Sequence, residues 1–264
     1  ALDQTLHAGI NMWADVSGER YEADKFDNNG NFKADLGYGM FGGDVALTDD
    51  IAVGAGFQYG TGSLRSGVAS IKNEIDSYGF TLYGSMKLGD AKIVGELAWL
   101  QSKNDITSSQ TALNQKVDAD IWSAGIRAQH AFTLGQFMVT PSVGLRVSYM
   151  ETDAMNIGAV KVEKQDQTLV QTPLALRITG APIQSSSGWS LAPNLKIAYV
   201  PTFGDKEIKV LGYETDVIDT SPVQGAFGIR ASNGNMLFNA DMTVGGGEYG
   251  TSSIGAKVGF KYAF

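Results

Sequence analysis

Apolar side chains alternate with small or polar ones along most of this chain, and this period of two constrains the fold more than any other feature. Successive side chains of a β-strand leave opposite faces, so the alternation predicts strands. In the segment 254–264 one face is apolar and ends in aromatic residues, while the other carries only Gly, Ala and Lys. Such a strand fits a lipid boundary better than water, because aromatic residues collect at membrane interfaces.

About twelve such segments follow one another, from 7–16 to 254–264. Short turns alternate with long polar stretches between them, so all short turns lie at one end of the sheet. An even number of antiparallel strands with this asymmetry is typical of an outer-membrane barrel with both termini in the periplasm. The prediction is a single all-β domain over 1–264, a transmembrane antiparallel β-barrel. The long polar stretches are expected to be loops, and they are 17–31, 60–76, 101–120, 151–168 and 201–222.

Two local features refine this prediction. In the second strand Leu36, Tyr38 and Met40 form the apolar set, and the phase becomes unclear at 42–44, which indicates a bulge. The sequence Ser-Asn-Gly at 232–234 predicts a tight hairpin, because Asn-Gly tolerates the positive φ of such a turn.

Composition excludes several classes of protein. The chain has no Cys, so it has neither disulfides nor thiolate metal sites. No run reaches the roughly 18 apolar residues of a membrane helix. The net charge of −8 argues against nucleic-acid binding. Neither a metal-ligand spacing nor a phosphate-binding loop is present, and we expect no cofactor, no metal and no catalytic residue.

The polar faces of the strands distinguish a membrane barrel from a soluble all-β domain. A soluble sandwich would present many Lys and Glu residues to water on these faces, whereas here they are mostly small, with sparse charges. Small residues with mixed charges suit a narrow, hydrated lumen. Two roles remain open for the charges, namely lining a pore and bracing the wall by pairing. The candidate lumen residues are Glu96, Arg127, Arg146, Arg177, Lys196, Arg230, Asp241 and Lys257.

Aromatic residues near the strand ends predict two girdles, one at each lipid interface. The girdle at the long-loop end is expected to contain Tyr59, Trp99, Trp122, Tyr149 and Tyr199. The girdle at the short-turn end is expected to contain Phe132 and Trp189, together with Tyr262 and Phe264.

The number of strands and the closing strand resemble the translocator β-domain of bacterial autotransporters, which belong to type V secretion. The last strand is similar to the signal read by the outer-membrane assembly machinery, with Lys257, Gly259, Tyr262 and Phe264 at the matching positions. The resemblance implies a monomer that contacts outer-membrane lipid and lipopolysaccharide. It also implies that the domain exports its own N-terminal passenger to the cell surface.

The same resemblance implies a pore-filling helix before the first strand. Residues 1–6 are too few for one, and we expect them to be the remnant of a linker or passenger. Some relatives cleave themselves inside the barrel. Asp15, Glu96 and Asp241 are the candidate acids here, but no junction for cleavage is recognisable, and self-cleavage is disfavoured.

Two other functions remain as alternatives. A passive outer-membrane channel for small anionic solutes is one, because the candidate lumen charges comprise six cations and two acids. A barrel hydrolase is the other, and it needs a His base near a nucleophile. His7 and His130 both fall toward the short-turn end and outside any nucleophile motif, so a role as interfacial anchors is favoured.

Overall fold

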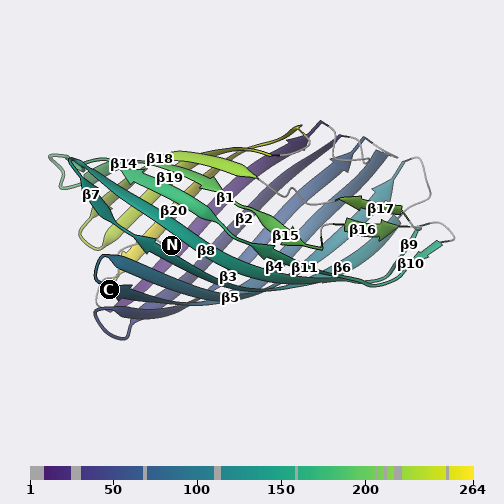
Figure 1. Cartoon of the computed structure of the whole chain (residues 1–264), viewed down its shortest axis with the longest axis horizontal. Coiled ribbons are helices and arrows are strands. Elements are labelled where there is room, and N and C mark those ends of the chain that lie inside the picture. Colours follow the sequence, from purple (N-terminus) through teal and green to yellow (C-terminus); the bar gives the residue numbers. More distant parts are fainter. Residues whose placement is uncertain are drawn as a thin grey trace.

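The computed structural model is built from β-strands, most of which join one antiparallel sheet that closes into a barrel (Figure 1). The structure describes residues 9–24, 31–67, 70–109, 114–157, 160–205, 207–210, 213–216, 222–247 and 250–264. The predictions made for residues 1–6 and His7 lie outside these ranges. In the described part of the chain, no helix is long and apolar enough to cross a membrane.

The strands of the sheet follow one another around the barrel in chain order. The strands in the first half are β1 (Ile10–Ala23), β2 (Phe32–Ala46), β3 (Ile51–Ser66), β4 (Ile71–Leu88), β5 (Ala91–Ser108) and β6 (Asn114–His130). Those in the second half are β8 (Phe137–Thr152), β11 (Gln165–Gln171), β12 (Leu174–Thr179), β14 (Ser190–Tyr199), β15 (Thr202–Gly204), β18 (Val223–Asn233), β19 (Met236–Gly246) and β20 (Thr251–Ala263).

Six short strands extend the hairpins. β7 (Phe132–Leu134) and β13 (Ile183–Gln184) lengthen the turns after β6 and β12. Two separate hairpins lie at the other end of the molecule (Figure 1). They are formed by β9 (Met155–Ile157) with β10 (Val160–Val162), and by β16 (Glu207–Val210) with β17 (Tyr213–Asp216).

The barrel has twelve strands, as predicted, because two of its strands are interrupted. β11 and β12 both pair with β8 and form one strand, and β14 with β15 forms the next. The interruptions fall at Pro173 and Pro201, and proline has no backbone N–H to donate across a sheet. The neighbouring carbonyls are still used, since Gly144 N donates to Pro173 O at 2.9 Å and Thr172 N to Pro201 O at 3.0 Å.

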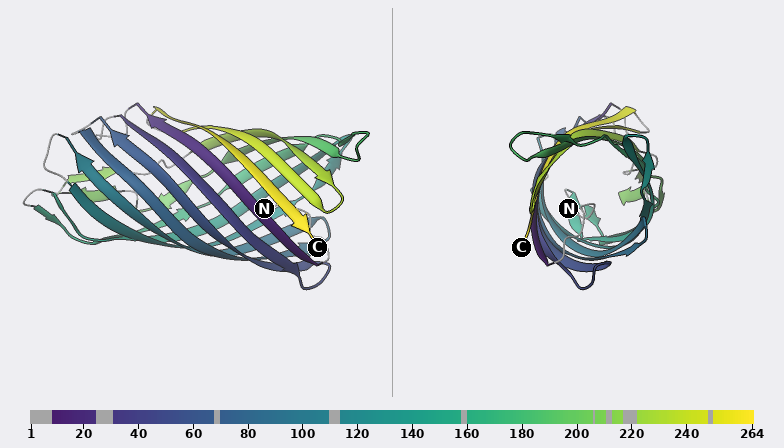
Figure 2. Two further views of the ribbon diagram at one scale, coloured as in Figure 1. Left: turned by 180° about the vertical axis from the view of Figure 1, so that it is seen from behind. Right: turned by 90° about the vertical axis from the view of Figure 1, so that its left-hand side faces the viewer.

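The first and last strands close the barrel. β20 pairs with β1 from Asn11↔Ala263 to Ala23↔Thr251, and Phe264 N donates to Ile10 O at 2.9 Å. Figure 2 shows the closed ring end-on and the C-terminus near the end that carries the short hairpins. Closure leaves neither strand with an unpaired edge.

The turns at this end are tight, as the sequence predicted. Gly89, Gly135 and Gly234 have φ values of 63°, 61° and 53°, a region that side chains disfavour. The predicted tight hairpin is present but lies one residue later, because Asn233 pairs with Met236 and the turn is formed by Gly234 and Asn235.

The prediction of long loops at the other end is wrong for most of their length. β1 continues to Ala23, β3 to Ser66 and β5 to Ser108, well into stretches that had been assigned to loops. The alternation disappears there because polar side chains occupy both faces, while the backbone hydrogen bonds continue. Pairs between strands replace the apolar contacts: Arg20 Nε lies 2.7 Å from Asp35 Oδ1, and Lys33 Nζ lies 3.0 Å from Glu22 Oε1.

The second strand also differs from its prediction. β2 keeps an unbroken register with β1 and β3 through 42–44, so no bulge is present. Its outer face carries Phe41 and Val45, whereas Met40 lines the interior cavity, and Leu36 and Tyr38 share its face. The phase was misread because this strand places apolar residues on the lumen side and glycines on the outer side.

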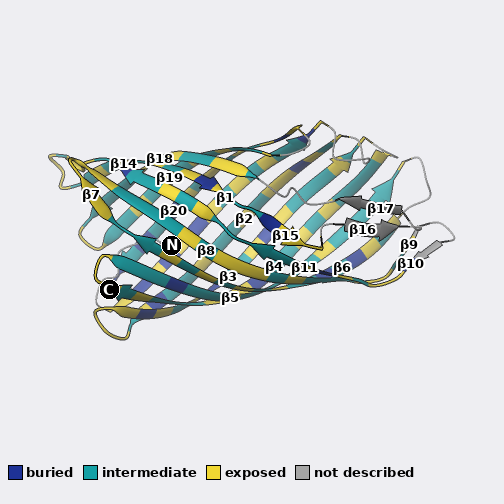
Figure 3. Ribbon diagram, in the orientation of Figure 1, coloured by how far each residue is buried: buried dark blue, intermediate teal, exposed yellow. Residues whose placement is uncertain are grey.

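The outside of the barrel is apolar and the inside polar, the reverse of a soluble protein. Val16, Phe41 and Leu82 are between 60 and 65% exposed, while Asn11 and Asp15 are 0% and 4% exposed. Figure 3 shows exposed and less exposed positions alternating along the strands. The outer surface therefore matches a hydrocarbon environment.

Candidate functional site

The lumen is the candidate site, and polar residues follow a single row of its wall. The register places Asn11 opposite Asp44, Asp44 opposite Gly54, and Gly54 opposite Tyr83. The row continues from Tyr83 through Glu96 and Gly125 to Arg146 on β8. Members of one row lie side by side around the barrel, so residues far apart in sequence form one belt.

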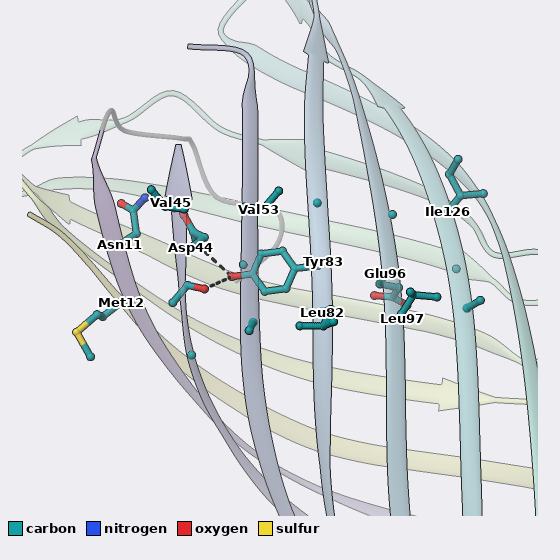
Figure 4. Close-up of a pocket in the computed structure, with 18 of the residues that line it drawn as sticks. Asn11, Met12, Asp44, Val45, Val53, Leu82, Tyr83, Glu96, Leu97 and Ile126 are labelled. Carbon is teal, nitrogen blue, oxygen red and sulfur yellow. Dashed lines mark hydrogen bonds between the residues drawn. The ribbon is translucent and has the colours of Figure 1, made fainter. Parts of the chain in front are cut away.

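Asp44 is the centre of a buried cluster in this row. Its Oδ1 accepts a hydrogen bond from Asn11 Nδ2 at 2.8 Å, and its Oδ2 accepts one from the Tyr83 hydroxyl at 3.2 Å (Figure 4). Lys261 Nζ lies 3.1 Å from Oδ2 and 3.4 Å from Oδ1. A carboxylate shielded from water needs such partners, because an unpaired buried charge is costly.

Two aromatic side chains lie over glycines of the wall. Trp13 covers Gly42 and Gly56, where an added Cβ would come within 2.5 Å and 2.7 Å of its ring. Tyr83 covers Gly54 in the same way. The Trp13 indole N–H donates to the Tyr83 hydroxyl at 2.6 Å, which joins β1 to β4 across two intervening strands. The glycines thus leave room for large side chains along the wall.

A second pair crosses a glycine farther along the row. Arg146 on β8 reaches past Gly125 to Glu96 on β5, with Nε 3.1 Å from Oε1 and a further contact through Nη2. A Cβ at Gly125 would lie 3.1 Å from the Glu96 side chain, so a larger residue would displace it. Two of the predicted lumen residues are thus a bracing pair, without excluding a role in lining the pore.

Five of the eight predicted lumen residues line one interior cavity of about 520 Å³. They are Glu96, Arg127, Arg146, Lys196 and Lys257, and Asp15 joins them. Lys257 Nζ lies 3.6 Å from Asp15 Oδ2. The charged side chains of this cavity comprise four cations and two carboxylates, so its charge is positive at neutral pH.

The other three predicted lumen residues lie outside this cavity but on the same face of their strands. Arg177 stands opposite Lys196 in the register, and Arg230 stands opposite Asn239. Asp241 stands opposite Lys257 and accepts a hydrogen bond from Asn239 Nδ2 at 3.3 Å. The role of all eight as a pore lining stays a prediction.

Aromatic residues on the outside form a continuous series over β2 to β6. Ring centroids are 5.5 Å apart for Phe41–Phe57, 5.2 Å for Phe57–Phe80 and 6.3 Å for Phe80–Trp99. Trp99 and Trp122 follow at 6.2 Å, and Tyr149 stands opposite Trp122 in the register. Because barrel strands are tilted, a row across them changes depth from strand to strand.

Two outward-facing aromatic residues in this region, Tyr59 and Trp99, direct their polar atoms toward acids. The Tyr59 hydroxyl lies 3.0 Å from Asp76 Oδ1, and Trp99 Nε1 lies 3.1 Å from Asp120 Oδ1. Farther toward the rim, Lys164 donates to Glu151, which raises the pKa of Lys164. Apolar rings thus give way to ionic groups, as at a lipid–water boundary.

The remaining predicted girdle residues lie near hairpin ends. Phe132 packs against His130 with ring centroids 4.3 Å apart, and Trp189 packs against Phe238 with ring centroids 5.7 Å apart. Tyr199 ends β14 at the opposite end from Trp189 and is 40% exposed. The assignment of these residues to two girdles stays a prediction.

The residues of the C-terminal signal divide between the two faces of β20. Tyr262 and Phe264 pack together on the outside, with centroids 4.8 Å apart. Lys257 and Gly259 face the lumen, where a Cβ on Gly259 would lie 2.2 Å from Asp15 Oδ1. Their role in assembly stays a prediction.

Sequence reasoning missed the Asp44 cluster. Lys261 belonged to the small or cationic face of the last strand, but nothing local connects it to Asp44, 217 residues away. The misread phase of β2 hid Asp44 as well. The described residues contain no group of three or more His, Cys, Asp or Glu placed to hold a metal ion.

Comparison with known proteins agrees with this architecture. The translocator domain of the autotransporter NalP from Neisseria meningitidis is similar, with a TM-score of 0.79 at 15% identity, over 100% of this chain and 91% of that one. The β-domain of the Bordetella autotransporter Brka gives 0.78 at 13% identity, over 97% of this chain and 100% of that one. The transport unit of AIDA-I from Escherichia coli gives 0.68 at 15% identity, over 100% and 93%. Comparison with curated proteins by sequence gave no match.

A family model identifies the chain from its sequence. The model for the autotransporter beta-domain matches residues 12–247. The unmatched residues are 1–11, which include the first two residues of β1, and 248–264, which include all of β20. This family consists of outer-membrane barrels, which accounts for the apolar outer surface and polar interior. The chain is therefore a member of the autotransporter β-domain family, an outer-membrane translocator.

Proposed function

We propose that this barrel moves an N-terminal passenger through its lumen to the cell surface and then anchors it in the outer membrane. The observation that carries the proposal is the polar interior. Around the cavity of about 520 Å³, charged side chains occupy positions that apolar residues would fill in a soluble barrel. Charged walls can replace water around a passing chain, which a packed core cannot do.

The positions at which the first and last strands end support a direction of transport. The described first and last strands both end among the short hairpins, at Ile10 and Ala263. We propose that this end faces the periplasm. Cysteine replacements test it cleanly, because the chain has no Cys of its own. In intact cells an impermeant maleimide should label Ser109→Cys, at the far end, and leave Asp49→Cys unlabelled until the outer membrane is opened. The reverse labelling pattern would overturn the assignment.

Export itself is tested by a reporter. A protease-sensitive epitope placed ahead of residue 1 should become accessible to external protease in intact cells that produce the barrel. A periplasmic protein in the same cells serves as the control for membrane integrity. An epitope that stays protected while the barrel is folded and inserted would refute the export function.

The outside of the barrel supports the proposed partners. Its apolar surface is suited to membrane lipid, and the ion pairs beyond the aromatic series are suited to lipopolysaccharide headgroups. We propose that the outer-membrane assembly machinery recognises the terminal strand, and that the domain works as a monomer. Crosslinking in the membrane should give no dimer of the barrel, and a reproducible dimer would overturn the last point.

A passive anion channel is the second candidate function. The charged side chains of the cavity comprise four cations and two acids, and this excess favours anions over cations in an open lumen. Anion preference in planar bilayers together with failure of the reporter assay would favour this function. We also propose that the barrel is not an enzyme, and hydrolysis of phospholipid or peptide substrates by the pure protein would contradict this.

A further inference from the structure

The contact between Lys261 and Asp44 spans the seam of the barrel. Lys261 belongs to β20, the last strand, and Asp44 belongs to β2, so the contact passes over β1 on the lumen side. Both side chains are 5% exposed. The pair therefore exists only after β20 has docked on β1, whereas the contacts of Asp44 with Asn11 and Tyr83 involve β1 to β4 alone.

The outer face of the seam selects its register weakly. The lipid-facing side chains of β1 are Ile10, Met12, Ala14 and Val16, and those of β20 from Ile254 to Phe264 are apolar as well. A slip by two residues keeps every side chain on its own face, so the apolar alternation survives it. The polar groups inside must then distinguish the registers.

One slipped register offers the lysines other acids. In the observed register Lys261 stands opposite Trp13 and Lys257 opposite Ser17. Moving β20 by two residues would place Lys261 opposite Asp15 and Lys257 opposite Glu19. Both lysines would then have carboxylates opposite them, so a local count of charges does not exclude this register.

The slipped register would separate Asp44 from Lys261, its cationic partner. A shift of two residues carries Lys261 about 7 Å along the strand, beyond the reach of a hydrogen bond to Asp44. Asp44 would remain buried among Asn11, Tyr83 and Gly54 with its charge uncompensated. In the observed register each lysine has an acid, Lys261 with Asp44 and Lys257 with Asp15.

We propose that Lys261 and Asp44 form a closure latch, which fixes the register of β20 on β1 when the barrel closes. Lys261 is thus a positioning residue for the seam. This role concerns formation of the barrel and does not depend on passenger export. It also differs from recognition of Tyr262 and Phe264, which lie on the opposite face of the strand.

Disulfide trapping reports the register directly, because the chain has no Cys of its own and only the introduced pair can form a disulfide. Gly18 stands opposite Ala256, so Gly18→Cys with Ala256→Cys reports the observed register. Gly18→Cys with Val258→Cys reports the register slipped by two. These positions lie on the outer face and leave the latch intact, and a Cβ on Gly18 meets nothing closer than 3.7 Å.

With the native latch, oxidation should trap only the Gly18–Ala256 pair. Asp44→Asn should make the slipped pair at least tenfold more abundant, since the buried charge no longer opposes the slip. Glu19→Gln is the matched control, because it removes an acid that only the slipped register pairs with a lysine and leaves the Lys257–Asp15 pair of the observed register in place. Added to Asp44→Asn, it should reduce the slipped pair again.

The exchange Asp44→Lys with Lys261→Asp keeps the test decisive if Asp44→Asn fails to fold. It restores an ion pair in the observed register. In the slipped register it places the new carboxylate at position 261 against Asp15, so only the Gly18–Ala256 pair should form. The proposal is overturned by a folded Asp44→Asn barrel that traps only the native pair. It is also overturned by an exchange variant that traps the slipped pair.

Discussion

The Trp13 indole N–H donates a hydrogen bond of 2.6 Å to the Tyr83 hydroxyl, over a part of the wall where glycines leave room for the two rings. The two residues are 70 positions apart in sequence. Their contact ties β1 to β4 and depends on Gly42, Gly54 and Gly56 beneath the rings.

Gly56→Ala should destabilise the barrel, because its Cβ would come within 2.7 Å of the Trp13 ring. Overpacking of this kind typically costs about 1–3 kcal/mol. The loss can be measured as a lower urea midpoint for unfolding in detergent or lipid. Gly39→Ala is the matched control, since an added Cβ there meets nothing within 4 Å. Equal midpoints for both variants would contradict the packing described for Trp13.

Tyr83→Phe should destabilise the barrel by about 1–3 kcal/mol, because it leaves buried partners without a hydrogen bond. The hydroxyl both accepts from Trp13 and donates to Asp44, so both residues lose a contact. Tyr38→Phe is a control on the lumen side, because Tyr38 is 42% exposed and water can replace its contacts. A Tyr83→Phe barrel as stable as the control would show that this cluster contributes little.

Arg127→Ala with Arg146→Ala should reduce the preference of the open lumen for anions. Both side chains line the interior cavity, and removing them takes away two of its four cations. Ion selectivity in planar bilayers measures the change. Arg20→Ala provides the control, because Arg20 pairs with Asp35 on the outer surface. Unchanged selectivity in the double variant would argue that these arginines only brace the wall.

Brominated lipids should quench Trp122 strongly and Trp13 weakly. Trp122 is 59% exposed on the outside, whereas Trp13 is 5% exposed on the lumen side. Variants that retain a single Trp, with Phe at the other positions, separate the two signals. Strong quenching of Trp13 would place lipid inside the barrel and contradict the assignment of faces.

Tyr262→Ala with Phe264→Ala should lower the amount of barrel inserted in the outer membrane of cells more than it lowers stability after refolding. The two rings pack on each other on the outer face of the barrel, whereas the buried cluster around Asp44 lies on the lumen side. Phe227→Ala, at an exposed position on β18, controls for general loss of apolar surface. Normal membrane yields of the double variant would refute a signalling role for the terminus.

Alternation alone predicted the number of strands, the tight hairpin between β18 and β19 and the faces of most strands, because these properties depend on neighbouring residues. It failed where both faces are polar: the strand ends at Ala23, Ser66 and Ser108 lie in stretches without alternation. There the backbone ladder continues, supported by pairs such as Arg20–Asp35 that the sequence does not mark as neighbours.

The lumen was only partly predictable for a similar reason. The alternation along each strand predicts that the charged side chains of Glu96 and Arg146 face the lumen. Their pairing across Gly125 depends on the register of three strands. The Lys261–Asp44 contact depends in addition on closure of the ends. Registers follow from the whole set of pairings, which a local pattern does not contain.

Photo-crosslinking to a stalled passenger determines whether the passenger crosses through the lumen of the barrel. A passenger that carries a tightly folded domain should arrest inside the barrel. A photoreactive amino acid at Arg127, which lines the cavity, should then crosslink to the passenger. The same group at Leu97, which is 60% exposed on the outer face, should not. Crosslinks from Leu97 but not from Arg127 would show that the passenger does not cross through this lumen.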